Sequence, residues 1–415
     1  MKPLLVNTSD IHGGAARAAY RLHQGLQQIG IESKMLVQKK ISSDVSVIGS
    51  KASIKGPQAS RWNVTSVSRY LVDRLPLAYY DFHNFQQIDW SPQWLPNNIH
   101  QKINQINPDV VHFHWICQGF VSVQEIAKIR QPLVWTFHDM WTFTGGCHYN
   151  GTCDRYKQTC GKCPQLSSDR EKDLSNWVWR RKKKYWKSLD FTVVTPSRWL
   201  ADCARSSPLL EGKKIEVIPN GLNLENFRPV AKDEARKALN LPLDKHLVLF
   251  GAMNSLHDKR KGFQYIKSVT GLLDNSTFEA IVFGNSSEGD QLDIPVNYLG
   301  KVSDNLLNSV YSAADTFVAP SVQDNLPNTI MESLACGTPC VAFNIGGIPD
   351  LIVHLENGYL ARPFDTEDLA RGIEWVVEHE QRRKRLSKAS RKYVEDNFEL
   401  GAIAKKHAEL YLKMY

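Results

Sequence analysis

Short apolar runs alternate with helical stretches in two successive series, and this alternation constrains the fold of the 415-residue chain more than any other feature. Runs rich in Val, Ile, Leu and Phe are typical of strands that are covered on both faces. Strands that alternate with helices indicate a parallel sheet, so the pattern predicts two doubly wound α/β domains of the Rossmann type. We expect strands at residues 3–9, 33–38, 109–115, 132–138 and 191–197 in the first series and at 247–253, 278–285, 296–300, 315–321 and 339–344 in the second.

The boundary between the two series is expected at a Pro-Asn-Gly turn, residues 219–221. We therefore predict an N-terminal domain over 1–218 and a C-terminal domain over 219–396. The amphipathic final stretch, 397–415, is expected to be a helix that packs back on the first domain. In sheets of this kind ligands bind beyond the carboxyl ends of the strands, so the loops after the strands should carry the functional residues.

Charge and composition narrow the function classes. The formal net charge of +8 favours anionic partners, such as a phosphate-bearing donor, an acidic membrane surface or nucleic acid. The start, MKPLLVNTSDIHGG, lacks the long apolar core and cleavage site of a signal peptide. No run approaches the ~18–20 apolar residues of a spanning helix. We expect a cytoplasmic protein with reduced thiols.

The segment 320–352, PSVQDNLPNTIMESLACGTPCVAFNIGGIPDLI, is the most informative part of the sequence. Asp324 lies in a polar loop after a strand, and Glu332 lies on the helix that Pro327 begins and Gly337 ends. Carboxylates accept hydrogen bonds from sugar hydroxyls, and the amides of a helix start hold an anionic diphosphate. The alternative is that Asp324 is a turn residue and Glu332 sits on a solvated helix face.

An acid, seven residues and a second acid is the hallmark of the family 4 glycosyltransferases of the GT-B fold, and Asp324 and Glu332 have that spacing. The segment resembles this family, and its NLPNT continuation is most similar to bacterial polysaccharide enzymes of the colanic-acid type. The family's first acid is usually Glu, so Asp324 is a shorter version. The resemblance also places Asn325 and Leu326 in the donor site.

This resemblance implies a GT-B fold, in which two Rossmann-like domains face each other across a cleft. It further implies a retaining hexosyltransferase that acts in surface polysaccharide synthesis. The donor would be a nucleotide sugar and the acceptor a saccharide or a lipid-linked saccharide. Catalysis would need no enzyme nucleophile, because the leaving phosphate itself accepts the proton of the acceptor. No DxD-type metal motif is convincingly placed in the sequence, which agrees with transfer without a metal cofactor.

The turn between the first strand and the first helix contains Gly13 and Gly14. Glycine lets backbone amides approach a phosphate closely, and the helix N-terminus adds favourable partial charge. By resemblance this loop covers the donor diphosphate, and Asp10 contacts the acceptor side. Arg17, one turn into the helix, is either a phosphate contact on that side or a solvated side chain.

Two strand ends supply further candidates. By resemblance His138 contacts the donor sugar, and it joins Asp324 and Lys261 in our predicted catalytic set. His112 and His114 share one face of the preceding strand, with His112 expected in the core and His114 on the acceptor side.

The family clamps the leaving diphosphate with a Lys before a Gly and with an upstream Arg. Lys261 matches the Lys, whereas Asn254 and Ser255 lie about where the Arg should be. Lys259 and Arg260 are either substitutes for that Arg or part of a solvated charge run.

Four cysteines follow with the spacing C-x5-C-x6-C-x2-C, namely Cys147, Cys153, Cys160 and Cys163. In a reducing compartment, four thiolates in a Gly-rich loop suit a tetrahedral structural zinc. A disulfide pair and free thiols are the alternatives. His148 is a substitute ligand if one cysteine is not used.

The stretch 176–189, NWVWRRKKKYWKSL, combines six Lys and Arg residues with three Trp residues. Interfacial helices show this combination, so contact with an acidic membrane on the cytoplasmic face is one hypothesis. A solvated helix whose tryptophans pack inward is the alternative.

Two other functions remain open from the sequence. A nucleotide-sugar epimerase would keep the fold and change the reaction. A zinc-containing nucleic-acid-binding protein would explain the charge and the cysteines, but no recognised nucleic-acid module is present, so we expect no nucleic-acid partner.

Overall fold

The computed structural model divides into two compact units. The N-terminal unit is Met1–Gly221 with Gly401–Tyr415, and the C-terminal unit is Leu222–Leu400. Each unit has one parallel sheet with helices around it, which confirms the predicted α/β class. The structure describes residues 1–49, 68–81, 89–252, 258–284 and 292–414.

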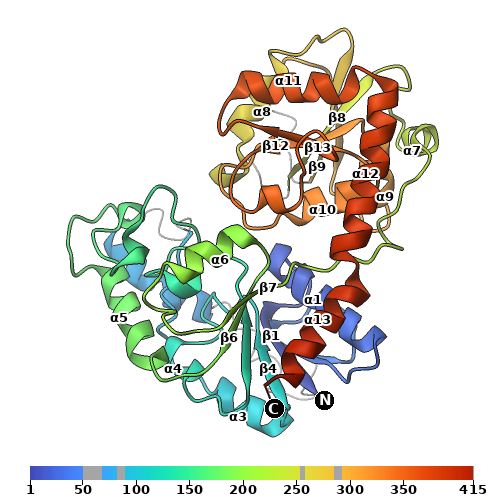
Figure 1. Ribbon diagram of the computed structural model, residues 1–415. Coiled ribbons are helices and arrows are strands. Elements are labelled where there is room, and N and C mark those ends of the chain that lie inside the picture. Colours follow the sequence, from blue (N-terminus) through green and yellow to red (C-terminus); the bar gives the residue numbers. More distant parts are fainter. Residues whose placement is uncertain (50–67, 82–88, 253–257, 285–291, 415) are drawn as a thin grey trace. The chain divides into compact units, whose positions relative to one another are not determined.

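The N-terminal unit contains a seven-stranded sheet in the order β3-β2-β1-β4-β5-β6-β7 (Figure 1). The order reverses between β1 and β4, which lie side by side with Val6 paired to Phe113. Such a switch point opens a crevice at the carboxyl ends of the strands. Its strands are β1 (Pro3–Ser9), β2 (Lys34–Lys39), β3 (Val47–Ile48), β4 (Val110–Phe113), β5 (Leu133–Thr136), β6 (Thr192–Thr195) and β7 (Ile215–Val217). Its helices are α1 (Gly14–Gln28), α3 (Ile99–Ile106), α4 (Val123–Ile126), α5 (Leu174–Trp186), α6 (Arg198–Arg205) and α13 (Leu400–Leu412).

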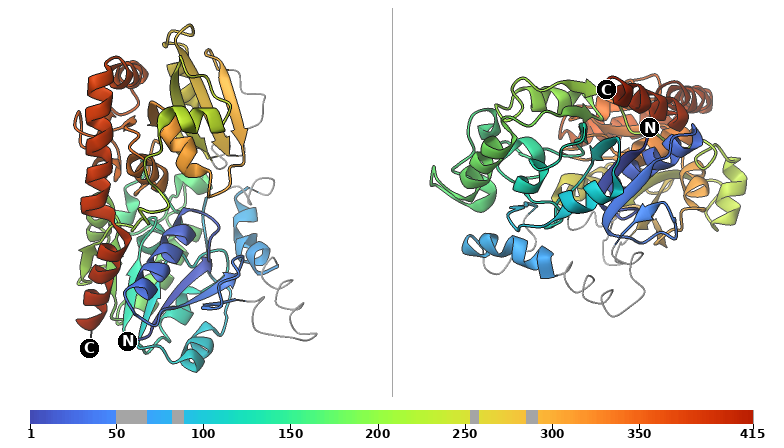
Figure 2. Two further views of the ribbon diagram at one scale, coloured as in Figure 1. Left: turned by 90° about the vertical axis from the view of Figure 1, so that its right-hand side faces the viewer. Right: turned by 90° about the horizontal axis from the view of Figure 1, so that it is seen from below.

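Different helices cover the two faces of this sheet. On one face Val134 packs with Leu22 of α1 and Tyr411 of α13. On the other face Trp135 packs with Trp186 of α5. This alternation follows from the period of two along a strand. Figure 2 shows α13 running alongside α1, so the last helix completes the core of the N-terminal unit.

The C-terminal unit contains a six-stranded sheet in the order β10-β9-β8-β11-β12-β13 (Figure 1). The order reverses between β8 and β11, so the loops that follow these two strands emerge next to each other. Its strands are β8 (His246–Ala252), β9 (Phe278–Gly284), β10 (Val296–Gly300), β11 (Thr316–Ala319), β12 (Cys340–Phe343) and β13 (Gly358–Ala361). Its helices are α7 (Lys232–Ala238), α8 (Phe263–Thr270), α9 (Leu307–Ala313), α10 (Asn328–Ala335), α11 (Thr366–Val377) and α12 (Glu380–Phe398).

The structure differs from the expected elements at several ends. β5 stops at Thr136, although the backbone N–H of Phe137 still donates to Val194 O at 2.9 Å. The final helix begins at Leu400 rather than near 397, because Glu399 adopts an extended conformation with ψ 130° and ends α12. Within the described residues no helix is both long and apolar enough to cross a bilayer.

Candidate active site

The loop between β11 and α10 carries an ion pair at the carboxyl edge of the C-terminal sheet. Lys261 Nζ donates to Asp324 Oδ2 at 2.6 Å. The carboxylate side chain is 10% exposed and the lysine side chain 38% exposed, so the pair lies at a surface that a ligand can reach. The structure therefore brings together two residues that the sequence places 63 positions apart.

Two glycines fix this loop from opposite sides. Gly262 has φ +70°, and a Cβ there would lie 1.8 Å from Pro320 O. Gly346 has φ +54°, and a Cβ there would lie 2.2 Å from Asp324 O. Gly347 N–H donates to the same Asp324 O at 3.0 Å. Only glycine allows these left-handed conformations and close approaches, so the position of Asp324 depends on both turns.

Glu332 lies on α10, directly behind this loop. Its residue is 4% exposed, so the alternative of a solvated helix face is wrong. The hydroxyl of buried Tyr311 donates to Glu332 Oε2 at 2.9 Å. Asn325 is 3% exposed, and Leu326 packs in the hydrophobic core of the unit. The side chain of Leu326 therefore packs in the core and leaves little exposed area for contact with a ligand.

The structure describes only some of the residues expected near the upstream basic position that would bind the leaving diphosphate. Asn254 and Ser255 lie outside the described residues, and the side chain of Lys259 does as well. Arg260 forms an ion pair with Asp258, with Nη2 to Oδ2 at 2.8 Å.

At the edge of the N-terminal sheet, Asp10 follows β1 and is fully buried. Its carboxylate accepts hydrogen bonds from the backbone N–H groups of Ile41 and Ser42 at 3.0 and 2.8 Å. Burial raises the pKa of Asp10, but the bonds from Ser42 and Ile41 outweigh it and hold the pKa below its usual value. Asp10 thus fixes the turn after β2.

The glycine turn that follows leads into α1. Gly13 has φ +94°, in the left-handed region, and α1 begins at Gly14. Arg17 is half-buried in the first turn of this helix. The first backbone amides of a helix have no acceptor within the helix, and α1 begins at the carboxyl edge of the sheet.

Two histidines meet at the ends of β4 and β5. His114 Nδ1 and His138 Nε2 are 3.0 Å apart, and the rings stack with centroids at 5.3 Å. His138 is half-buried, whereas His114 is 4% exposed. Burial lowers the pKa of His138 to about 4, although Asp139 opposes this, and lowers that of His114 well below its usual value. Both imidazoles are therefore neutral, with one nitrogen donating and the other accepting.

His112 lies in the core behind this pair, as expected. Its Nδ1 is 2.6 Å from Tyr411 Oη and its Nε2 is 2.7 Å from Thr136 Oγ1. The ring of His407 packs at 5.3 Å from that of His112. The contact of His407 with His112 was not predicted, although His407 and Tyr411 are four residues apart in a helix and therefore share one face.

A second buried network joins the end of β5 to the cysteine loop. His148 Nδ1 is 2.6 Å from Asp139 Oδ2, and His148 Nε2 is 2.9 Å from Ser91 Oγ. Trp115 Nε1 also donates to Asp139 Oδ2 at 2.8 Å. The chain Ser91–His148–Asp139 has the connectivity of a hydrolase triad, but Ser91 is 3% exposed, so a substrate carbonyl has no access. The network is structural.

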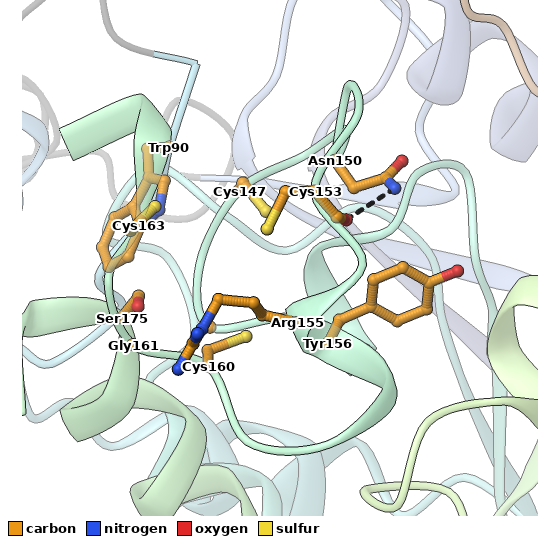
Figure 3. A pocket seen from close by; sticks show the side chains of 11 residues that line it. Trp90, Cys147, Asn150, Cys153, Arg155, Tyr156, Cys160, Gly161, Cys163 and Ser175 are labelled. Carbon is orange, nitrogen blue, oxygen red and sulfur yellow. Dashed lines mark hydrogen bonds between the residues drawn. The ribbon is translucent and has the colours of Figure 1, made fainter. Parts of the chain in front are cut away.

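The four cysteines of the loop line one cavity of about 20 Å³. Figure 3 shows Cys160 on the opposite side of this cavity from Cys147 and Cys153. In the described part of the chain no group of three or more His, Cys, Asp or Glu side chains has an arrangement that holds a metal ion. His148, the substitute ligand, bonds to Asp139 and Ser91 instead.

The basic and aromatic helix is α5. Trp179 and Trp186 pack in the core, whereas Trp177 is 45% exposed. Lys182 does not belong to the cationic surface, because it is 0% exposed. Its Nζ donates to the carbonyls of Trp141 and Thr144 and lies 3.7 Å from the Trp141 ring centroid. Burial lowers the pKa of Lys182 to about 7. The tryptophans thus mostly pack inward.

Two family models match the chain. Residues 12–226 match glycosyltransferase family 4, and residues 231–393 match the glycosyl transferases group 1. The putative colanic acid biosynthesis glycosyl transferase WcaC of Escherichia coli is 25% identical over 363 residues, 82% of this chain and 83% of that protein. An Escherichia coli UDP-Gal:alpha-D-GlcNAc-diphosphoundecaprenol alpha-1,3-galactosyltransferase is 25% identical over 214 residues, 48% of this chain and 54% of that protein.

Solved structures share the fold at lower identity. Sucrose-phosphate synthase from Thermosynechococcus elongatus has a TM-score of 0.70 and 19% identity, covering 100% of this chain and 98% of its own. HepE from Anabaena, solved in complex with UDP-glucose, has a TM-score of 0.62 and 15% identity over 100% of both chains. Both likenesses agree with the predicted GT-B class, and none of these four proteins is a nucleic-acid-binding protein or an epimerase by name. Because the family 4 model covers more than half of the chain, the protein belongs to glycosyltransferase family 4 and is a glycosyltransferase.

Proposed function

We propose that this glycosyltransferase transfers a hexosyl group from a nucleotide sugar to a saccharide or lipid-linked acceptor in surface polysaccharide synthesis, with retention at the anomeric carbon and without a catalytic metal. The observation that carries the proposal is the Lys261–Asp324 pair, held between Gly262 and Gly346 at the switch point of the C-terminal sheet. The name of WcaC and the UDP-glucose complex of HepE support the substrate class.

The donor site needs a cation for the diphosphate and carboxylates for the sugar hydroxyls. Lys261 supplies the cation, and it would exchange its bond to Asp324 for one to a phosphate oxygen. Asp324 is then free to accept from a hexose hydroxyl, and Glu332 accepts from the ribose. The start of α10, at Asn328, adds backbone amides beside these groups.

The reaction breaks the bond between the anomeric carbon and the phosphate oxygen and forms a bond from that carbon to the acceptor oxygen. The proton of the acceptor hydroxyl passes to the leaving phosphate. The transition state is oxocarbenium-like, so the main task of the protein is to stabilise the departing diphosphate and to orient the reactants. In the C-terminal unit, leaving-group stabilisation is the proposed role of Lys261.

His138 is the proposed orienting residue of the N-terminal unit, with Asp10 and Arg17 on the acceptor side. Its neutral ring donates from one nitrogen and accepts at the other. We propose that His114 is a positioning residue, because its Nδ1 lies 3.0 Å from His138 Nε2 and holds the orientation of that ring.

A lipid-linked acceptor would bring the protein to a membrane surface. The exposed cations of α5, Arg180, Lys183 and Lys184, lie on the same helix as the exposed ring of Trp177. The name of the undecaprenol-dependent galactosyltransferase supports an acceptor of this kind. We propose transient contact of this face with anionic lipid headgroups.

A donor screen tests the proposed reaction. The purified chain is incubated with a panel of nucleotide sugars and candidate acceptors, and product is detected by mass spectrometry and by NMR at the anomeric centre. The proposal expects nucleotide diphosphate release that needs an acceptor, retention of the anomeric configuration and unchanged turnover in EDTA. Conversion of the donor without any acceptor would favour an epimerase, and an inverted product would exclude the retaining mechanism.

A further inference from the structure

The loop between β5 and α5 contains little regular secondary structure. Between Gly145 and Asp173 the structure has only short 3-10 turns, at Arg155–Lys157 and Pro164–Leu166. A connection of this length without regular structure is uncommon inside a compact domain. Nevertheless it is anchored beside His138, because His148 bonds to Asp139 and Met140 N–H donates to His148 O at 2.9 Å. Its buried apolar side chains are Tyr156, Cys160, Cys163 and Leu166, which pack with residues outside the loop, and two of these four are cysteines.

Four thiols surround one cavity in this loop. The cavity of about 20 Å³ is lined by Cys147, Cys153, Cys160 and Cys163, which Figure 3 draws around it. This volume accommodates one particle of about the size of a water molecule. All eight cysteines of the chain are free thiols in the structure, so no disulfide accounts for the cluster.

Burial makes an uncompensated thiolate costly in this cavity. It raises the pKa of Cys163 to about 11 and that of Cys160 to about 12, whereas the backbone N–H groups of Leu166 and Gln165 near Cys163, and of Gly145 near Cys160, act in the opposite direction. A charged sulfur here therefore needs a cation beside it.

Two positive groups, Lys182 and Arg155, adjoin the cluster. Lys182 is 0% exposed, its Nζ donates to the carbonyls of Trp141 and Thr144, and the nearby thiols Cys147 and Cys160 together with Asp139 oppose the effect of burial on its pKa. Arg155 lines the cavity, and its buried Nε has no hydrogen-bond partner, although its Nη2 pairs with Glu171. A buried cation is costly unless negative charge lies nearby.

We propose that Cys147, Cys153, Cys160 and Cys163 bind one structural Zn²⁺ as thiolates. Binding releases the four thiol protons and leaves a site of net charge −2, which Lys182 and Arg155 offset. Among the described residues the four side chains are not arranged at metal-binding distances, so zinc binding requires the cysteines to change rotamer. All four positions are taken by sulfur, so the ion orders the loop and takes no part in transfer.

The first experiment measures zinc in the full-length protein purified without chelators. Elemental analysis should give about one zinc per chain. An organomercurial titration should release it, and a cobalt-substituted sample should show the intense sulfur-to-cobalt and ligand-field absorption of a tetrahedral tetrathiolate site. A protein without zinc whose intact mass is lower by two hydrogens per disulfide would overturn the proposal, as would a zinc-free protein with eight reactive thiols.

Matched variants locate the ion. Cys160→Ser should lower the zinc content at least tenfold, whereas Cys203→Ser, a half-buried thiol outside the cavity, should keep it. Zinc retained in Cys160→Ser, or lost equally in Cys203→Ser, would contradict the assignment. If Cys160→Ser fails to fold, the metal content and thiol count of the unchanged protein still decide the question. The outcome is independent of the proposed reaction, because no substrate is needed.

Discussion

The Lys261–Asp324 pair matters for chemistry more than for stability. Its lysine is more than a third exposed, and exposed pairs contribute only about 0–1 kcal/mol to folding. A cation placed where charge develops in the transition state, by contrast, contributes a rate factor of about 10²–10³. The same residue therefore has a small stability effect and a large predicted effect on turnover.

This contrast gives the first prediction. Lys261→Met should reduce turnover by about two orders of magnitude and shift the melting temperature little. Lys267→Met, an exposed lysine on α8, is the matched control and should keep full activity. Equal turnover in the two variants would exclude Lys261 from the leaving-group site.

The contact between His114 and His138 gives the second prediction. His114→Phe removes the bond and should lower kcat about tenfold, the value of one hydrogen bond of about 1.4 kcal/mol, with KM for the donor unchanged. His114→Asn keeps a polar atom near the position of Nδ1 and should restore part of kcat. If both variants lose the same activity, or if only KM changes, His114 does not position His138.

The residue types of the donor loop could be read from the sequence, but their partners could not. Asp324 and Glu332 stand out by spacing and by their place after a strand. The bond between Tyr311 and Glu332 and the contact of Asp10 with Ile41 and Ser42 depend on tertiary packing, which no local pattern encodes. The buried position of Lys182 was also missed, because a run of Lys and Arg residues resembles a solvated face.

At the scale of elements, two glycine turns control the donor loop. Gly262→Ala places a Cβ against Pro320 O and also strains a left-handed conformation, whereas Gly300 has φ +60° with nothing within 4 Å of its Cβ. Gly300→Ala should therefore cost only the conformational strain of about 1–2 kcal/mol. Gly262→Ala should cost more in denaturant unfolding and should abolish donor binding. Equal costs would mean that the loop relaxes around the new methyl group.

Helix α5 gives a prediction for membrane contact. Changing Arg180, Lys183 and Lys184 to Glu should abolish sedimentation with anionic vesicles, since each basic residue contributes about 1 kcal/mol. Lys182 stays unchanged, because its burial makes it part of the core. The control is binding to neutral vesicles, which should be weak in both proteins. Unchanged binding to anionic vesicles would rule out this face.

Long buried strands were the elements that the sequence predicted best. Every expected strand is present, because a run of β-branched and aromatic residues between turns strongly favours a strand in an α/β chain. The edge strands Val47–Ile48, Ile215–Val217 and Gly358–Ala361 were not predicted, because they are only partly buried and their apolar runs are correspondingly short. The break at Glu399 was missed because the apolar pattern continues through it.

At the scale of the whole molecule, buried neutral histidines make stability depend on pH. Burial lowers the pKa of His407 from 6.5 to about 3. Its contribution is fully present above the unfolded pKa and is lost as pH falls toward the folded one, because the unfolded chain binds the proton first. The protein should thus lose stability steadily below about pH 6.5.

A variant tests this dependence. His407→Phe should remove about 2 kcal/mol of the stability difference between about pH 7.5 and pH 5 in urea unfolding. His379→Gln changes a 59% exposed histidine and should leave the pH dependence as it is. If the stability of His407→Phe falls with decreasing pH as much as that of the unchanged protein does, groups other than His407 dominate the pH dependence.

The proposed donor site requires that the C-terminal unit binds a nucleoside diphosphate, with Glu332 accepting from its ribose. The direct measurement is the thermal shift produced by UDP, GDP and ADP in the unchanged protein, in Glu332→Gln and in Tyr311→Phe. Tyr311→Phe removes the same hydrogen bond but keeps the carboxylate. We predict that one diphosphate stabilises the unchanged protein and Tyr311→Phe, and that Glu332→Gln loses the effect. Stabilisation that survives in Glu332→Gln would contradict this role of Glu332.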